Sequence, residues 1–338
     1  MRRLITYLFL TWLLFSGVIH AQQFPLTTQY LFNPYVLNPA MAGYYGFSEV
    51  HLNFRREWVN IQGGPQTFRA TGFSSIYEDK MWLGAEVYSD KVGAFSTFKS
   101  GLSYSYILQT GDDQQLFFGI WANYLQNSFN VSGAVGIDPN DPLIANRSTV
   151  NGNVFNGGFG LVYNWYDLNI GFAFPNMFAD THIPSATTAD FSMQREFLFH
   201  ISNIFNITDQ WRLKGEAVYR KTKNEPSLME LSAMALLNSQ FWTALTYRTT
   251  GVVAINIGGY VGGGILFDYA YELGTSGINR SSGGTHEISL SIRFGMQGNR
   301  YFESKNHPAT KRKRLRRSRY NTGRQPRVLD YKYRSFRR

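Results

Sequence analysis

The chain has 338 residues and no cysteine, and it combines 16% aromatic with only 17% charged residues. Without thiols, a disulfide-stapled domain, a zinc finger, an iron–sulfur protein and a cysteine-nucleophile enzyme are excluded. Beyond the N-terminus there is no run of about 18 apolar residues, which excludes a helical transporter. Many Gly, Tyr and Phe residues (32, 21 and 27) with few charges are typical of a transmembrane β-barrel.

The net charge of +10 is unevenly distributed along the chain. Residues 299–338 contain 15 basic and two acidic residues, a net charge of +13. Residues 22–298 contain 16 basic and 21 acidic residues, a net charge of −5. The chain is therefore a mildly acidic body followed by a strongly basic tail.

The first 21 residues have the composition of a secretory signal peptide. Arg2 and Arg3 precede an apolar stretch, residues 4–19, and the small residue Ala21 precedes the polar pair Gln22 and Gln23. This order of charged, apolar and small residues predicts cleavage after Ala21. A retained signal anchor is the alternative, but the apolar stretch is short for a spanning helix. We expect the mature chain to lie outside the inner membrane.

Apolar and polar residues alternate along most of the body, as in residues 286–294, where Ile288, Leu290, Ile292 and Phe294 alternate with polar residues. This period of two indicates strands with one apolar face. Fourteen segments have this character: 47–58, 66–77, 81–89, 97–108, 114–125, 154–165, 167–174, 196–206, 211–220, 227–237, 241–247, 252–260, 264–273 and 286–294. Three longer polar segments, 127–153, 175–195 and 274–285, are expected to face the cell exterior.

A soluble β-sandwich would show the same alternation, so periodicity alone does not decide between the two folds. Aromatic residues near strand ends favour the barrel, because membrane interfaces attract them. The candidates are Trp58, Tyr77, Trp82, Tyr106, Trp165, Phe174, Trp211, Tyr219, Trp242 and Tyr247. We therefore predict an all-β, antiparallel transmembrane barrel of about 14 strands over residues 47–298, integral to the outer membrane.

Four segments resemble the PorP/SprF family, outer-membrane proteins of the Bacteroidetes type IX secretion system. The most specific is residues 28–43, with the pairs Asn33-Pro34 and Asn38-Pro39; the others are 56–67, 90–94 and 286–294. The resemblance covers residues 22–295. It implies an outer-membrane barrel that supports secretion or cell-surface attachment of type IX cargo, a secreted protein with a C-terminal signal domain, in some members a large gliding adhesin. It does not identify the cargo.

The opening motif predicts an irregular element over residues 22–46. Proline removes a backbone donor and restricts the residue before it, so neither a central strand nor a long helix fits. We expect a cap at the periplasmic mouth or a partial plug folded into the lumen. The residues proposed to bind a partner there are Tyr30, Phe32, Asn33, Pro34, Asn38 and Pro39. A purely structural cap is the alternative.

The basic tail, residues 299–338, extends beyond the resemblance. Its densest run consists of Lys311, Arg312, Lys313, Arg314, Arg316, Arg317 and Arg319. Behind a signal peptide a nucleic-acid partner is not expected, and an even strand number predicts both termini in the periplasm. Arginine interleaved with aromatic residues suits acidic components of the secretion or gliding machinery, peptidoglycan, or outer-membrane lipid. A solvated tail without a specific partner is the alternative.

No motif for catalysis, a cofactor or a metal stands out. Nucleotide-binding, zinc-protease and hydrolase signatures do not occur, so we predict a protein that is not an enzyme. Asp138, Asn140 and Asp141 lie in a loop that could hold a hard cation, but turn chemistry explains them. His51, His200 and His286 are expected to form hydrogen bonds inside the lumen. The leading alternative function is a porin or substrate-specific channel; a surface-exposed hydrolase is a third.

Overall fold

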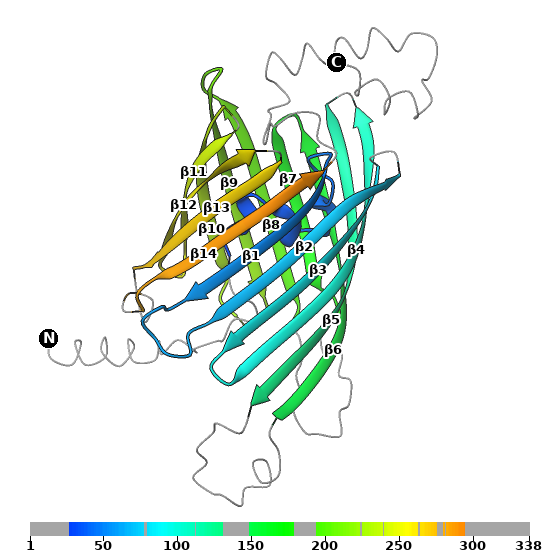
Figure 1. Ribbon diagram of the computed structural model, residues 1–338. Helices are drawn as coiled ribbons and strands as arrows, with labels where there is room; N and C mark the ends of the chain where they lie inside the picture. The colour runs from blue at the N-terminus through cyan, green and yellow to red at the C-terminus, as the bar shows by residue number, and fades with distance from the viewer. Residues whose placement is uncertain are drawn as a thin grey trace, which may run out of the picture.

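The computed structural model describes residues 27–77, 80–111, 113–130, 149–178, 194–223, 225–238, 240–262, 264–275, 280 and 282–294. Fourteen strands form one closed barrel in which each strand pairs with its sequence neighbours and β1 pairs with β14 (Figure 1). The strands are β1 (Ser48–Glu57), β2 (Gln66–Tyr77), β3 (Met81–Val92), β4 (Phe95–Gly111), β5 (Gln114–Asn130), β6 (Thr149–Trp165), β7 (Leu168–Asn176), β8 (Glu196–Asn206), β9 (Trp211–Thr222), β10 (Leu228–Leu237), β11 (Phe241–Arg248), β12 (Val252–Gly262), β13 (Ile265–Gly274) and β14 (Thr285–Phe294).

The two ends of the barrel differ in the length of their connections. At one end, which we call the short-turn end, six connections of two to four residues join the strands, and β1 begins and β14 ends there. The other end, the long-loop end, contains the connections 131–148, 177–195 and 275–284. The three longer polar segments therefore connect strands at the same end, and that this end faces the cell exterior stays a prediction.

The fourteen predicted strands are confirmed, and most boundaries agree within a few residues. The clearest difference is at β5 and β6, which continue to Asn130 and begin at Thr149, in a segment that reads as polar loop. The pairing of β5 with β6 is continuous to the last pair, and Phe95 and Phe129 pack with ring centroids 4.6 Å apart. Because Phe95 is the first residue of β4, this contact ties the end of β5 to β4, and the hairpin of β5 and β6 extends past the neighbouring strands in Figure 1.

Alternation places one set of side chains on the outer surface and the other in the lumen. In β14 the exposed residues are Ile288, Leu290, Ile292 and Phe294, whereas Glu287, Ser289 and Ser291 are buried. The outer surface is therefore apolar, as lipid contact requires. Among the predicted girdle residues, Tyr77, Trp165, Trp211, Tyr219 and Tyr247 are exposed on it. None of the helical segments in the described residues is long and apolar enough to cross a membrane.

Three side-chain predictions are wrong. His286 has the parity of Ile288 and lies on the outer face, where it contacts the Tyr269 hydroxyl. Trp82 and Trp242 are buried in the lumen, with 1% and 4% exposure, and do not belong to a girdle. The period of two already groups His286 with the apolar residues of β14 and Trp82 with Glu86 of β3. Of these three strands only β11 has aromatic residues on both faces, so that its pattern does not show which face meets lipid.

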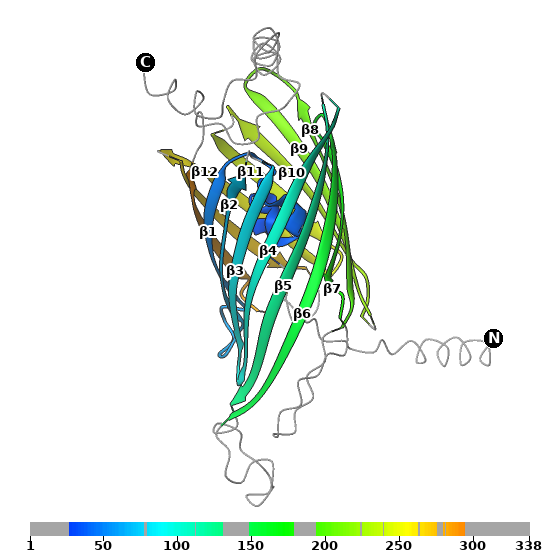
Figure 2. The same cartoon turned by 90° about the vertical axis from the view of Figure 1, so that its right-hand side faces the viewer.

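The segment before β1 lies inside the barrel (Figures 1 and 2). Three short 3₁₀ turns, η1 (Gln29–Leu31), η2 (Pro34–Val36) and η3 (Pro39–Met41), follow one another, and two of them begin with proline. Proline at the first position suits such a turn because its fixed φ is already helical. We call Thr27–Phe47 the plug. This segment was expected either at the periplasmic mouth or in the lumen, and the structure shows it in the lumen.

Candidate functional site: the plugged lumen

The plug runs lengthwise through the lumen. Its first residues contact Glu287, which is the third residue of β14 from the long-loop end. Its last residue, Phe47, leads directly into β1 at the short-turn end. Between these points nearly every plug residue is buried; Gly46 alone is exposed. The plug therefore fills the middle of the barrel and contacts the wall along its path.

Glycines in the wall allow the plug to approach closely. A Cβ on Gly119 of β5 would collide with the backbone of Pro39 and Ala40, and a Cβ on Gly160 of β6 would collide with the Asn38 side chain. On β3, a Cβ on Gly84 would lie 2.7 Å from the Tyr35 hydroxyl. Glycine inside a strand often marks such a close approach. These three glycines form the seat of the plug.

An apolar core holds one side of the plug. Tyr30, Leu31, Phe32 and Leu37 pack in one buried cluster with residues of β7 to β11 and β13. The wall residues in this cluster are Ala173, Leu198, Val218, Met234, Leu236, Trp242, Ala244 and Leu266. Phe32 lies on Trp242 with ring centroids 5.0 Å apart, which explains why this tryptophan faces inward. Burial of this apolar surface favours the inserted state of the plug.

Hydrogen bonds fix the register of the plug against the wall. The Asn33 amide donates to Thr71 on β2 over 2.7 Å, and Asn38 donates to the carbonyl of Phe172 on β7 over 3.0 Å. The Tyr35 hydroxyl lies 2.8 Å from Ser103 on β4. Burial raises the pKa of Tyr35, so this hydroxyl keeps its proton. Buried polar groups need such partners, and a shifted plug would lose them.

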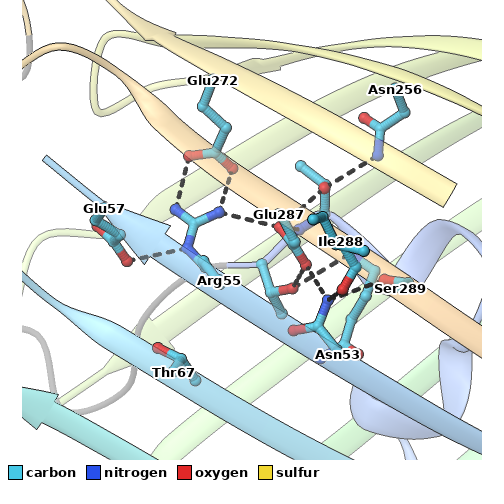
Figure 3. A network of polar contacts seen from close by, with 12 residues as sticks. Asn53, Arg55, Glu57, Thr67, Asn256, Glu272, Glu287, Ile288 and Ser289 are labelled. Atoms are coloured by element: carbon cyan, nitrogen blue, oxygen red, sulfur yellow. Dashed lines mark hydrogen bonds and ion pairs between the residues drawn. The ribbon is translucent and has the colours of Figure 1, made fainter. Parts of the chain in front are cut away.

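A buried ionic network anchors the first residues of the plug (Figure 3). The Thr28 amide and hydroxyl both donate to Glu287 over 3.1 Å, and Thr27 donates to the same carboxylate. Arg55 of β1 also binds Glu287, at 3.0 Å, and forms a bidentate pair with Glu272 at 2.8 and 2.7 Å. Because these groups come from β1, β13, β14 and the plug, the network links the plug to the strands that close the barrel.

Aromatic residues cover the plug at the short-turn end. Tyr44 and Tyr45 pack edge to face with centroids 4.8 Å apart, and Tyr45 stacks on Phe47. The Arg293 guanidinium lies 4.3 Å from the centroid of the Phe47 ring and donates to Glu49 over 2.8 Å. Such a cation–aromatic contact is stabilising in a desolvated setting. The exit of the plug towards β1 is therefore as closely packed as its middle.

The structure brings together one of the two groups of predicted site residues. Tyr30, Phe32, Asn33, Pro34, Asn38 and Pro39 all lie in the plug and are at least nine-tenths buried. In this arrangement they contact the barrel wall. The second group, the basic run of Lys311 to Arg319, lies outside the described residues, as does the candidate cation loop at Asp138.

The histidines and carboxylates of the described lumen lie mostly in hydrogen bonds and ion pairs. His51 and His200 lie in the lumen as expected; the Asn38 amide lies 3.3 Å from His200, and His51 lies 3.5 Å from Glu49. Among the described residues no group of three or more His, Asp or Glu side chains could hold a metal ion. The charged side chains of the lumen instead form ion pairs, and their arrangement suits structure and binding.

The sequence contains a signal for the seat of the plug. Gly84, Gly119 and Gly160 each interrupt a predicted strand on the face that now proves to be internal. Glycines on the same face of three strands could have indicated that another segment of the chain packs closely against the wall. The wall partners Thr71, Ser103 and Glu287 give no such signal, because polar residues are ordinary in a barrel lumen.

The closed antiparallel wall, the apolar outer surface and the filled lumen define the class: a plugged β-barrel of the outer-membrane type. The sequence matches the family described as "Type IX secretion system membrane protein PorP/SprF" over residues 19–292. The chain belongs to this family. It is thus an outer-membrane barrel of the type IX secretion system, as the resemblance implied. No curated protein matches the sequence.

Several solved barrels are similar at low sequence identity. Omp33 of Acinetobacter baumannii has 9% identity and a TM-score of 0.42, covering 73% of this chain and 98% of that one. The CymD monoaromatic hydrocarbon channel has 13% identity and a TM-score of 0.47, covering 80% and 92%. The KdgM porin has 8% identity and a TM-score of 0.37, covering 73% and 99%. At these scores the likenesses say nothing about a transported substrate.

Proposed function

We propose that this barrel acts without catalysis as the outer-membrane anchor to which a secreted type IX cargo protein is attached at the cell surface. The observation that carries the proposal is the plug, because a lumen filled by a packed segment of the chain is suited to an anchor and is not suited to free diffusion of solutes. Family membership supports the link to secretion.

The orientation of the barrel follows the pattern of outer-membrane proteins. Short turns face the periplasm and long loops face the exterior in such barrels. The long-loop end then faces the cell surface, and cargo would be held there. β14 ends at Phe294 at the short-turn end. With this orientation the basic tail would follow in the periplasm and would bind an acidic component of the machinery, peptidoglycan or lipid headgroups. The expected periplasmic N-terminus concerns residues outside the described ones.

The alternative function, a porin, can be distinguished by conductance: a porin would conduct ions freely, whereas a plugged anchor would not. The purified barrel in a planar bilayer is expected to show little or no current, because the plug and its buried contacts occupy the lumen. Steady currents of the size that open porins give would favour the porin. A hydrolase would require turnover that a single substitution at the rim abolishes.

The direct test of attachment is removal of the barrel from the cell. Without it, the cargo is expected to be secreted yet found in the medium instead of on the cell surface, and re-expression of the barrel should return it to the surface. A cargo that stays on the surface of cells lacking the barrel would refute the proposed function.

A further inference from the structure

A row of polar side chains crosses the outer face of the barrel at the long-loop end. The register of four neighbouring strands places His286 of β14, Arg56 of β1, Gln66 of β2 and Lys91 of β3 next to one another. We call these four residues the basic row. Their strands lie side by side at the front of the barrel in Figure 1. Each residue is the first or second from the end of its strand, so the basic row follows the rim.

The basic row lies where the outer face changes from polar to apolar. Two positions further from the rim, Ile288, Phe54 and Phe68 are exposed apolar side chains on the same strands, and on β3 the apolar surface begins at Val87. A membrane meets such a boundary with its headgroups on the polar side and its acyl chains on the apolar side. The basic row therefore lies at the depth of lipid headgroups.

Charges at this rim are segregated between the two faces of the wall. The nearby carboxylates face the lumen, where Glu57, Glu272 and Glu287 all bind Arg55. Asp90 also faces inward and accepts a hydrogen bond from a threonine of β2. The connections at this rim, residues 58–65, 93–94 and 275–284, contain no Asp or Glu. The outer face of the rim is therefore positive.

The two cations of the basic row are available to a ligand. The side chains of Arg56 and Lys91 are exposed, and neither forms an ion pair within the described residues. They are two strands apart, which separates their backbones by about 10 Å. Long side chains that start this far apart can reach the same anion between them, and Gln66 provides an amide donor from the strand in the middle.

His286 adds an oriented donor to the basic row. Its Nδ1 lies 2.7 Å from the Tyr269 hydroxyl, and its ring packs on Tyr271 with centroids 5.0 Å apart. These contacts fix the direction of the imidazole. With the hydroxyl as donor to Nδ1, the proton of the neutral ring is on Nε2, which can donate to an oxygen outside the chain.

This set of donors is complementary to a phosphate group. Arginine binds phosphate through two parallel N–H groups, and lysine adds a compact charge. A free phosphate ion would use only the polar half of this surface. A lipid with a phosphate in its headgroup would use both halves, because its acyl chains would lie along the exposed Phe54 and Phe68.

We propose that the basic row binds the phosphate of an anionic lipid in the leaflet at the long-loop end, with the acyl chains of that lipid along Phe54 and Phe68. Because Arg56 belongs to β1 and His286 to β14, the bound headgroup spans the seam at which the barrel closes. The proposal is independent of the proposed function, since lipid surrounds the barrel whatever the barrel anchors.

The test uses the purified full-length barrel in a nonionic detergent and a phosphatidic acid with a fluorescent label on one acyl chain. Diacylglycerol with the same chains lacks the phosphate, and glycerol 3-phosphate as a competitor lacks the chains. We expect saturable binding of phosphatidic acid, at least tenfold weaker binding of diacylglycerol, and weak competition by glycerol 3-phosphate. Equal binding of the two lipids would refute the phosphate site. Glycerol 3-phosphate that competes as well as unlabelled phosphatidic acid would refute the assignment to a lipid.

Matched variants locate the site. Arg56→Gln and Lys91→Gln each remove one cation, so each should weaken phosphatidic acid at least fivefold and leave diacylglycerol unchanged. Lys221→Gln is the control, because Lys221 is an exposed lysine near the same end of the barrel but on β9, away from the basic row. Heat-modifiable migration shows that each variant is folded. Folded variants that bind phosphatidic acid like the wild type would overturn the proposal, as would an equal loss in the control.

Discussion

Single residues decide whether the plug fits. Gly119 lies under the backbone of Pro39 and Ala40, and backbone cannot move aside as a flexible side chain can. At Gly72 on β2, by contrast, a Cβ would make only ordinary contacts of 3.6 Å. Alanine substitutions at Gly119 and at Gly72 are therefore a matched pair: both add one methyl group to a strand, but only the first meets the plug.

Gly119→Ala should displace the plug from its seat. We expect the free energy of unfolding to fall by about 1–3 kcal/mol, typical of overpacking, and conductance in a planar bilayer to rise. Gly72→Ala should change neither quantity. If Gly119→Ala keeps wild-type stability and remains closed, the close approach of the plug at this point has no energetic role.

The anchor of the plug depends on one carboxylate. Glu287 accepts from Thr28, Asn53 and Arg55, and all four side chains are buried. Glu287→Gln removes one of the carboxylates that bind Arg55. We therefore expect the free energy of unfolding to fall by about 3 kcal/mol, the scale for breaking a buried ion pair. Denaturant unfolding of the refolded barrel measures this loss. Asp209→Asn in an exposed turn is the control, and equal stability of the two variants would contradict the anchoring role.

At the scale of elements, the strands and the plug depend on each other to different degrees. The wall is closed by backbone pairing of all 14 strands, including β1 with β14. The plug has no strand pairing and is held by side chains, glycine contacts and the apolar cluster. The wall should therefore fold without the plug, whereas the plug requires the wall.

Deletion of residues 28–42 tests this order. The shortened protein should still form a heat-modifiable barrel in the outer membrane, and it should conduct ions. Its thermal stability should be lower, because the apolar cluster loses the residues that the plug contributes. Single-channel recording and heat-modifiable migration give the two readouts. A deleted form that folds and stays closed would show that something other than the plug closes the lumen.

The elements also show what the sequence could predict. Alternation predicts all fourteen strands because a period of two is a local property of the chain. The position of the plug is not local: Asn33 and Pro34 predict an irregular segment, and only the long-range contacts to Thr71 and Ser103 place it in the lumen. Trp82 and Trp242 read as girdle residues for the same reason, since their partners Gly43 and Phe32 are far away in sequence.

At the scale of the whole molecule, the basic tail and the barrel are expected to act at different places. Deleting residues 299–338 should leave a folded barrel in the outer membrane and abolish co-purification of a periplasmic partner. Replacing the basic residues between Lys311 and Arg319 by Gln should weaken the same association, and higher salt should weaken the native one, because exposed charges are screened. A partner retained by the shortened protein would rule out a tether in the tail.

As a whole, the barrel is proposed to anchor a secreted protein. The most direct measurement is a mild-detergent pull-down from the native outer membrane, comparing the full-length protein with a form ending at Gly298 and identifying every co-eluting chain. We expect a large secreted protein with a type IX signal to elute with both forms, which would place its recognition on the barrel. A barrel recovered alone from both samples would contradict the proposed anchoring role.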